Sequence, residues 1–145
     1  MYTTEILLLR TRRLNGKSAK KTMVAMIKNI LLVAAGGALG SAGRYGLTLL
    51  ASQLQLRAEW ATFAANVLGS LLIGLFLCGP KSEYFLFYTV GICGGFTTFS
   101  TFSAQSLRLL HDGQYAWALL YIVGSIAVSL AMVALGWYCR QKIWG

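Results

Sequence analysis

The stretch from Gly91 to Ser106, GICGGFTTFSTFSAQS, is rich in hydroxyl side chains and has no charged residue, within a chain that is otherwise strongly apolar. Four of its residues fall at i, i+3, i+4 and i+7, on one helix face: Phe99, Phe102, Ser103 and Ser106. Phenylalanines at this spacing usually only pack. An aromatic ring also has an electropositive edge, however, and ring edges beside hydroxyl donors would suit a small desolvated anion. The stretch therefore predicts a neutral hydrogen-bonding site.

Two more segments carry polar or small residues at helical spacing: Asn66, Ser70 and Gly74 in one, and Tyr121, Ser125 and Ser129 in the other. Each set recurs every four residues and so lies on one helix face. Such side chains can join helices, with each hydrogen bond contributing about 0.6–2 kcal/mol. Together with the face of Phe99 to Ser106, the chain has three such polar faces, which is more than helix packing requires. They predict a narrow path lined by hydrogen-bonding groups.

The acidic residues and the histidine all lie outside the apolar segments or at their edges: Glu5, Glu59, Glu83, His111 and Asp112. A proton-coupled exporter needs an ionisable group deep in the bilayer. Nucleophilic catalysis needs a base beside the nucleophile, and the serines of the apolar segments have none nearby in the sequence. The His111-Asp112 pair fits a solvated turn better than a catalytic dyad, because it stands alone in a loop. The sequence therefore predicts neither an enzyme nor an organic cofactor.

The composition is that of a membrane protein. Of the 145 residues, 57% are hydrophobic and 12% are charged, whereas a soluble domain carries about a quarter charged residues. The formal net charge of +9 would suit a nucleic-acid-binding protein. The basic residues instead flank apolar runs, as membrane topology requires. We therefore expect lipid around the chain and no nucleic-acid partner.

Four segments are long and apolar enough to cross a bilayer, which takes about twenty residues: Ile27–Leu50, Trp60–Gly79, Tyr84–Leu110 and Tyr115–Tyr138. The sequence thus predicts an all-α membrane protein with four transmembrane helices and short loops. Small residues recur within these segments at a spacing that lets helices approach closely. Because four helices have little interior of their own, we expect an oligomer.

The third segment should be broken between Gly94 and Thr98. The pairs Gly94-Gly95 and Thr97-Thr98 make a poor helix, since a glycine costs about 1 kcal/mol relative to alanine. Backbone groups exposed by a break are tolerated in a membrane only when they are buried in protein or line a cavity. Carbonyl groups at such a break can bind a cation.

Three motifs in these segments resemble those of one known family. GGFTTFSTFS, residues 94–103, resembles the signature of the Fluc (CrcB) family of fluoride ion channels. GGALGSAGRYG, residues 36–46, and ANVLGSLLIG, residues 65–74, resemble its other two motifs. The resemblance extends from about Ile27 to the C-terminus in matching order and does not cover residues 1–22.

The resemblance implies an antiparallel, dual-topology homodimer in the cell (inner) membrane. Such a protein is a fluoride-specific channel that passively exports fluoride and lowers its cytoplasmic concentration. Its partners would be fluoride, membrane lipid and a second copy of the chain in the opposite orientation. Two residues depart from the family pattern: Phe96 stands where leucine is common, and Gln105 where many members have a carboxylate.

The resemblance also assigns roles by position. The residues matched to the fluoride pathway are Asn66, Phe99, Ser100, Thr101, Phe102, Ser103, Tyr121, Ser125 and Ser129. The main-chain carbonyls of Gly94 and Thr97 match those that hold a structural sodium ion at the dimer centre. Arg44 matches an arginine near the end of the first helix, with a structural or electrostatic role.

A basic extension precedes the part of the chain that the resemblance covers. Residues 1–22 hold six of the thirteen basic residues, Arg10, Arg12, Arg13, Lys17, Lys20 and Lys21. We expect residues 1–22 to be disordered and residues 23–145 to form the four-helix transmembrane channel domain. A cleaved secretory signal does not fit, because the apolar run continues to Leu50. Since so many basic residues should fix orientation, we expect either a functional start at Met23 or Met26 or an extension that the insertion machinery ignores.

Two other kinds of protein fit four short apolar segments. A small multidrug exporter would need a membrane-buried acid in its first helix, and Met26–Leu50 contains none. A holin-like or structural membrane protein would use the polar stripes only for packing. That alternative leaves the Gly-Gly and Thr-Thr pairs of the third segment unexplained.

Overall fold

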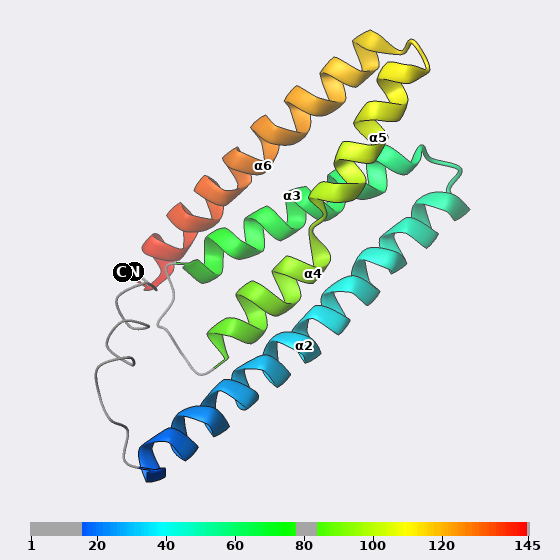
Figure 1. The fold of residues 1–145 in the computed structure, drawn as a ribbon. Coiled ribbons are helices and arrows are strands. Elements are labelled where there is room, and N and C mark those ends of the chain that lie inside the picture. Colours follow the sequence, from blue (N-terminus) through cyan, green and yellow to red (C-terminus); the bar gives the residue numbers. More distant parts are fainter. Residues whose placement is uncertain (1–15, 78–83, 145) are drawn as a thin grey trace. The chain divides into compact units, whose positions relative to one another are not determined.

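The computed structural model describes residues 16–77 and 84–144, and every regular element in these ranges is a helix (Figure 1). In chain order the elements are α2 (Gly16–Gln53), α3 (Ala58–Leu77), η1 (Phe87–Cys93), α4 (Gly94–Phe96), α5 (Phe99–His111) and α6 (Tyr115–Trp144). The all-helical class predicted from the sequence is confirmed for these residues.

The chain divides into two compact units, Met1–Leu31 and Leu32–Gly145. In the first unit, α2 begins at Gly16 and so includes residues 16–22 of the basic extension. Alanine and lysine have high helix propensity, and a helix propagates readily from an established apolar run. Residues 1–15 of the expected extension lie outside the described residues, and the domain boundary after residue 22 stays a prediction.

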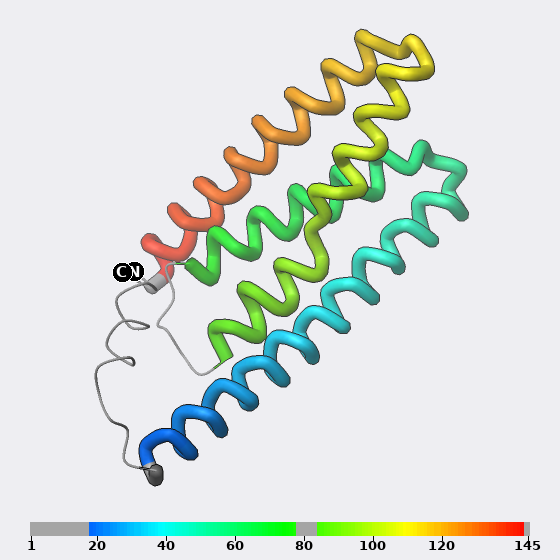
Figure 2. The backbone as a smooth tube through the Cα atoms, viewed as in Figure 1, coloured from blue at the N-terminus to red at the C-terminus, as the bar shows by residue number. Residues whose placement is uncertain are grey.

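Three described helices are long and apolar enough to cross a membrane: Ser18–Gln53, Ala58–Leu77 and Tyr115–Ile143. They correspond to the first, second and fourth predicted segments. The third predicted segment is present in pieces, with 7 residues in η1, 3 in α4 and 13 in α5. The tube in Figure 2 shows the step in the chain between α4 and α5.

Two glycines of α2 let its backbone touch that of the third segment. A methyl group at Gly36 would meet the carbonyl oxygen of Phe87, and one at Gly40 would meet that of Ile92. Both contacts lie along η1, a π-helix, which is a wide helical form found mostly in short stretches. Close contact through small residues is the usual way in which helices pack in lipid.

Glycines also join α3 to α6. A methyl group at Gly74 would meet the carbonyl oxygen of Val133, and one at Gly136 would meet that of Leu71. Nearer the other end of α6, a buried apolar cluster packs α5 against α6 and contains Phe102, Leu109, Ala118 and Tyr121. These two contacts hold α3, α5 and α6 around the break in the third segment.

The turn between α5 and α6 closes with a glycine. Gly113 has a φ of +72°, a conformation that glycine adopts without strain. The N–H of Gly113 donates to the Leu110 carbonyl at 3.2 Å, and that of Gln114 donates to the Leu109 carbonyl at 2.9 Å. These bonds satisfy the last carbonyls of α5 and direct the chain into α6.

Candidate functional site

The third segment is interrupted at two threonines. Thr97 has φ −78° and ψ 156°, and Thr98 has φ −150° and ψ 109°, so both are extended. The break therefore falls within the predicted window of Gly94–Thr98 but is narrower than expected, because Gly94 and Gly95 remain helical. β-Branched residues such as threonine accept extended backbone readily. Gly95 serves close packing instead, since a methyl group there would lie 2.6 Å from the Gly37 carbonyl oxygen.

Asn66 of α3 binds the backbone at this break. Its Oδ1 accepts a hydrogen bond from the N–H of Thr98 at 2.8 Å, and its Nδ2 donates to the carbonyl oxygen of Thr98 at 3.3 Å. A residue 32 positions away in the sequence thus satisfies both backbone groups of Thr98. In an apolar setting such groups must find partners within the protein.

Thr98 is the N-cap of α5. Its hydroxyl oxygen accepts a hydrogen bond from the N–H of Thr101 at 3.3 Å. The same hydroxyl donates to the Thr101 hydroxyl at 3.0 Å and lies 3.4 Å from that of Ser100. The predicted pathway residues Ser100 and Thr101 are therefore gathered around the start of α5.

The two carbonyls predicted to hold a cation have lost their usual helical partners. In a continuous α-helix the N–H of Thr98 would bond to the Gly94 carbonyl and that of Thr101 to the Thr97 carbonyl. Both N–H groups donate elsewhere, to Asn66 and to the Thr98 hydroxyl. Carbonyl oxygens released in this way are the ligand type that suits a hard cation.

Arg44 of α2 contacts the same region. Its Nε donates to the carbonyl oxygen of Gly95 at 3.3 Å, and the hydroxyl of Ser41 donates to the same oxygen at 3.5 Å. Arg44 therefore ties α2 to the segment just before the break. Its predicted electrostatic role remains a prediction.

A cleft of about 410 Å³ opens beside the break. Its polar lining comes from the second, third and fourth apolar segments and includes Asn66, Ser70, Thr97, Thr98, Ser125 and Ser129. Phe99, Phe102, Gly94 and several aliphatic residues complete the wall. The lining that the structure describes holds no acidic or basic side chain. The cleft therefore offers hydrogen-bond donors and ring edges without a fixed charge.

The two phenylalanines differ in exposure. Phe99 is 78% exposed, whereas Phe102 is 8% exposed. Their ring centroids are 5.8 Å apart, and the Phe102 ring lies 5.3 Å from that of Tyr121. These three aromatic residues, all predicted for the pathway, thus form a row of rings. The Phe99 end of the row is exposed in the single subunit.

The hydroxyl groups near the cleft differ in where they donate. Ser103 donates to the Phe99 carbonyl at 2.9 Å, and Ser106 donates to the Phe102 carbonyl at 2.8 Å, both within α5. Ser125 of α6 is 4% exposed, and its Oγ has no hydrogen-bond partner within the described residues. Buried hydroxyls are normally paired. Ser125 is therefore a buried cleft donor that is available to a bound species.

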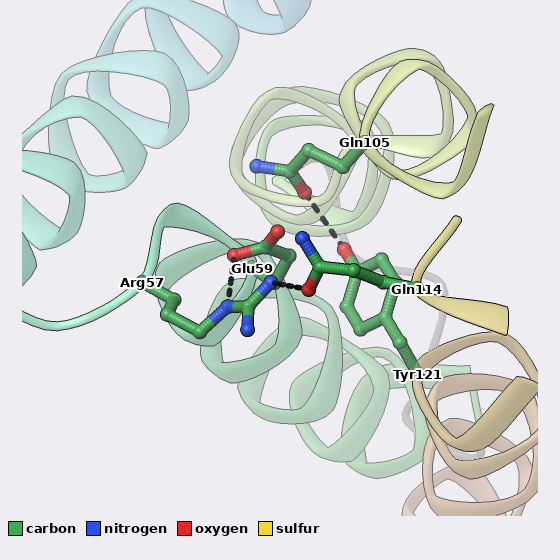
Figure 3. A network of polar contacts seen from close by, with 5 residues as sticks. All are labelled: Arg57, Glu59, Gln105, Gln114 and Tyr121. Atoms are coloured by element: carbon green, nitrogen blue, oxygen red, sulfur yellow. Dashed lines mark hydrogen bonds and ion pairs between the residues drawn. The ribbon is translucent and has the colours of Figure 1, made fainter. Parts of the chain in front are cut away.

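Tyr121 and Gln105 form a hydrogen bond that the sequence did not predict. The hydroxyl of Tyr121 donates to Gln105 Oε1 at 2.8 Å (Figure 3). Tyr121 lines a second, smaller pocket of about 200 Å³ rather than the main cleft. Among the predicted pathway residues, Ser100, Thr101 and Ser103 also stand outside the lining of the main cleft. The departure from the family pattern at Gln105 was the only sequence signal for this contact.

A second polar group lies beside that pocket (Figure 3). Arg57 Nη2 donates to Gln114 Oε1 at 2.8 Å, and its Nε lies 3.5 Å from Glu59 Oε2. The guanidinium also lies 5.1 Å from the centroid of the Trp117 ring. Arg57 thereby joins the α2–α3 turn to the start of α6. The nearness of Arg57 to Glu59 was visible in the sequence, but the bond between Arg57 and Gln114 was not.

The fold and the site define a small, multi-pass helical membrane protein with an uncharged polar cleft at a broken helix. The family model described as CrcB-like protein, Camphor Resistance (CrcB), matches residues 31–137, which is more than half of the chain.

Three curated relatives show the extent of the similarity. A protein from Phocaeicola vulgatus named fluoride-specific ion channel FluC is 43% identical over 116 residues, covering 76% of this chain and 96% of its own length. Proteins of the same name from Rhodospirillum rubrum and Thermus thermophilus are each 45% identical. These alignments cover 73% and 77% of this chain and 89% and 94% of the relatives. The chain belongs to the CrcB family.

Proposed function

We propose that this protein is a fluoride-specific channel that lets fluoride leave the cell passively and so lowers its cytoplasmic concentration. The names of the relatives support the choice of ion. The observation that carries the mechanism is the uncharged cleft beside the broken helix. The protein is a channel rather than an enzyme.

Fluoride is small and strongly hydrated, so each water that it loses must be replaced by a donor from the protein. Asn66, the hydroxyls of the cleft and the edges of the phenylalanine rings supply such donors. A fixed cation in the cleft would hold the anion too tightly, whereas conduction requires binding that is weak enough to release it. Ser125 supports this assignment because its buried hydroxyl has no partner among the described residues.

The pathway would follow one row of rings and two rows of polar groups. Phe99, Phe102 and Tyr121 form the row of rings. Asn66 stands on α3, and Ser125 and Ser129 stand on α6. Ser100, Thr101 and Ser103 flank the start of α5 and would extend the polar lining. Passive exit is sufficient, because hydrogen fluoride crosses membranes as a neutral acid and dissociates inside the cell.

A second copy in the antiparallel orientation would complete each pathway. The cleft opens on one side of the subunit, and the uncovered ring of Phe99 stands at its edge. An exposed aromatic ring beside polar groups is typical of a surface that another chain covers. The proposed assembly is a homodimer in the cell (inner) membrane, surrounded by lipid.

A structural sodium ion is proposed at the Gly94 and Thr97 carbonyls. These oxygens fit a hard cation, since the N–H groups that would normally bind them donate elsewhere. Such an ion would supply positive charge that stabilises the carbonyl dipoles of two broken helices at the dimer centre. Arg44, through its bond to Gly95, would hold the segment before the break in place.

Growth of a fluoride-sensitive bacterial host tests the proposed function. Expression of the chain should restore growth on fluoride medium and lower the fluoride content of the cells, while growth on chloride medium stays unchanged. Full-length protein that reaches the membrane without lowering cellular fluoride would contradict the proposal.

A further inference from the structure

We infer that Asn66 is a positioning residue that keeps the third segment broken and thereby frees a main-chain carbonyl for a cation. The inference rests on the cation site proposed above and assigns to Asn66 a role beyond that of a fluoride donor. Two hydrogen bonds to Thr98, at 2.8 and 3.3 Å, join its side chain to the backbone of the third segment.

The two bonds use both ends of the side-chain amide. The oxygen accepts from the Thr98 N–H and the nitrogen donates to the Thr98 carbonyl. Asparagine alone among short side chains offers an acceptor and a donor at this spacing, because aspartate has no donor and leucine has neither. The extended conformation of Thr98 is therefore matched by one residue of α3.

The bond to the Thr98 N–H has a consequence four residues earlier. In a continuous helix this N–H would occupy the Gly94 carbonyl. With Asn66 as its acceptor, the Gly94 carbonyl stays free to bind another group. A side chain on α3 thus acts on a carbonyl oxygen of α4 through the N–H of Thr98.

Thr98 frees the second carbonyl in the same manner. Its hydroxyl accepts from the Thr101 N–H, which would otherwise occupy the Thr97 carbonyl. Asn66 and the Thr98 hydroxyl therefore have parallel effects. Each accepts the N–H that would otherwise bind one of the two proposed cation ligands. Replacing either residue by an apolar one leaves an N–H whose nearest helical acceptor is the carbonyl in question, so the helix should close.

Sodium-dependent reassembly separates this role from fluoride conduction. The purified full-length protein is dissociated and reassembled in sodium chloride or in N-methylglucamine chloride, and the fraction of dimer is measured by size-exclusion chromatography. Wild-type protein should form a larger fraction of dimer in sodium chloride than in N-methylglucamine chloride. Phe99→Ala should show the same gain, because it leaves Asn66 and Thr98 unchanged. Asn66→Leu should lose the gain produced by sodium.

Substitutions of Thr98 provide an independent pair in case Asn66→Leu fails to fold. Thr98→Val removes the capping hydroxyl and should lose the sodium gain, whereas Thr98→Ser keeps the hydroxyl and should retain it. An undiminished gain in Asn66→Leu and Thr98→Val overturns the inference, as does a wild-type dimer that is indifferent to sodium. Fluoride efflux from the same wild-type preparation shows separately whether the proposed function stands.

Discussion

At the scale of single residues, the hydroxyl groups differ by where their protons are directed. Ser103 and Ser106 donate to carbonyls of their own helix. Ser125 is buried like Ser106 but has no partner among the described residues. A buried hydroxyl without a partner costs stability unless something binds it. The difference makes Ser125 and Ser106 a matched pair for testing the pathway.

Ser125→Ala should lower fluoride flux about tenfold, since a hydrogen bond to a charged species contributes roughly 1.5–3 kcal/mol. Its free energy of unfolding should not decrease, because the substitution removes a buried hydroxyl that has no protein partner among the described residues. Ser106→Ala is the control and should leave flux close to the wild-type value. Equal flux in the two variants, measured with a fluoride electrode on proteoliposomes, would remove Ser125 from the pathway.

Phe99→Ala and Phe102→Ala should both reduce fluoride flux strongly while the dimer remains assembled, because each removes a ring edge from the cleft. Only Phe102→Ala should also destabilise the fold, by about 3–5 kcal/mol, since that ring is buried against Tyr121. Phe102→Leu is the matched control: it restores apolar volume and stability without restoring flux. Wild-type flux in the alanine variants would show that both rings only pack and do not contribute to the pathway.

At the scale of the elements, glycine contacts set the distance between helices. Gly40 of α2 lies against the Ile92 carbonyl oxygen and the Phe96 N–H nitrogen of the third segment. Gly46, further along the same helix, has nothing within 4 Å of an added Cβ in the subunit. The two glycines belong to the same helix but differ in packing.

Gly40→Ala should therefore destabilise the protein by about 1–3 kcal/mol, because the added methyl group overlaps backbone that cannot move aside. Gly46→Ala should be neutral or stabilising by up to about 1 kcal/mol, since alanine is the better helix former. Thermal unfolding in detergent measures both. A Gly40→Ala protein as stable as Gly46→Ala would show that the α2 contact is looser than described.

Much of the element order was predictable from the sequence, because apolar length and turn residues are local signals. The four apolar segments and the window of the break follow from such signals. The position of the break at Thr97 and Thr98 does not, since it depends on bonds from Asn66, 32 residues away. The close packing of Gly95 against Gly37 of α2 likewise joins segments that are distant in the sequence. The bonds of Gln105 and Gln114 also join distant segments, so local rules could not have found them.

At the scale of the whole molecule, an antiparallel dimer requires chains that insert in both orientations. Basic residues near the ends of spans set orientation. The six basic residues within positions 1–22 bias the N-terminal side toward the cytoplasm. Without them the remaining basic residues are divided almost evenly between the two sides expected for four spans.

Removal of residues 1–22 should therefore bring the two orientations close to equal abundance, whereas the full chain should favour a cytoplasmic N-terminus. Reporter fusions at the C-terminus, active on opposite sides of the membrane, measure the ratio. A full chain that reports both orientations equally and confers full fluoride resistance would show that the extension does not engage the insertion machinery.

Fluoride efflux from liposomes that contain the purified protein tests directly whether the protein is a fluoride channel. With a potassium ionophore to balance charge, a fluoride electrode should record rapid release from loaded vesicles. A chloride electrode should record almost none, because the uncharged cleft is matched to a small anion that needs close donors. If folded, dimeric protein released fluoride no faster than protein-free vesicles do, the proposed channel function would be wrong.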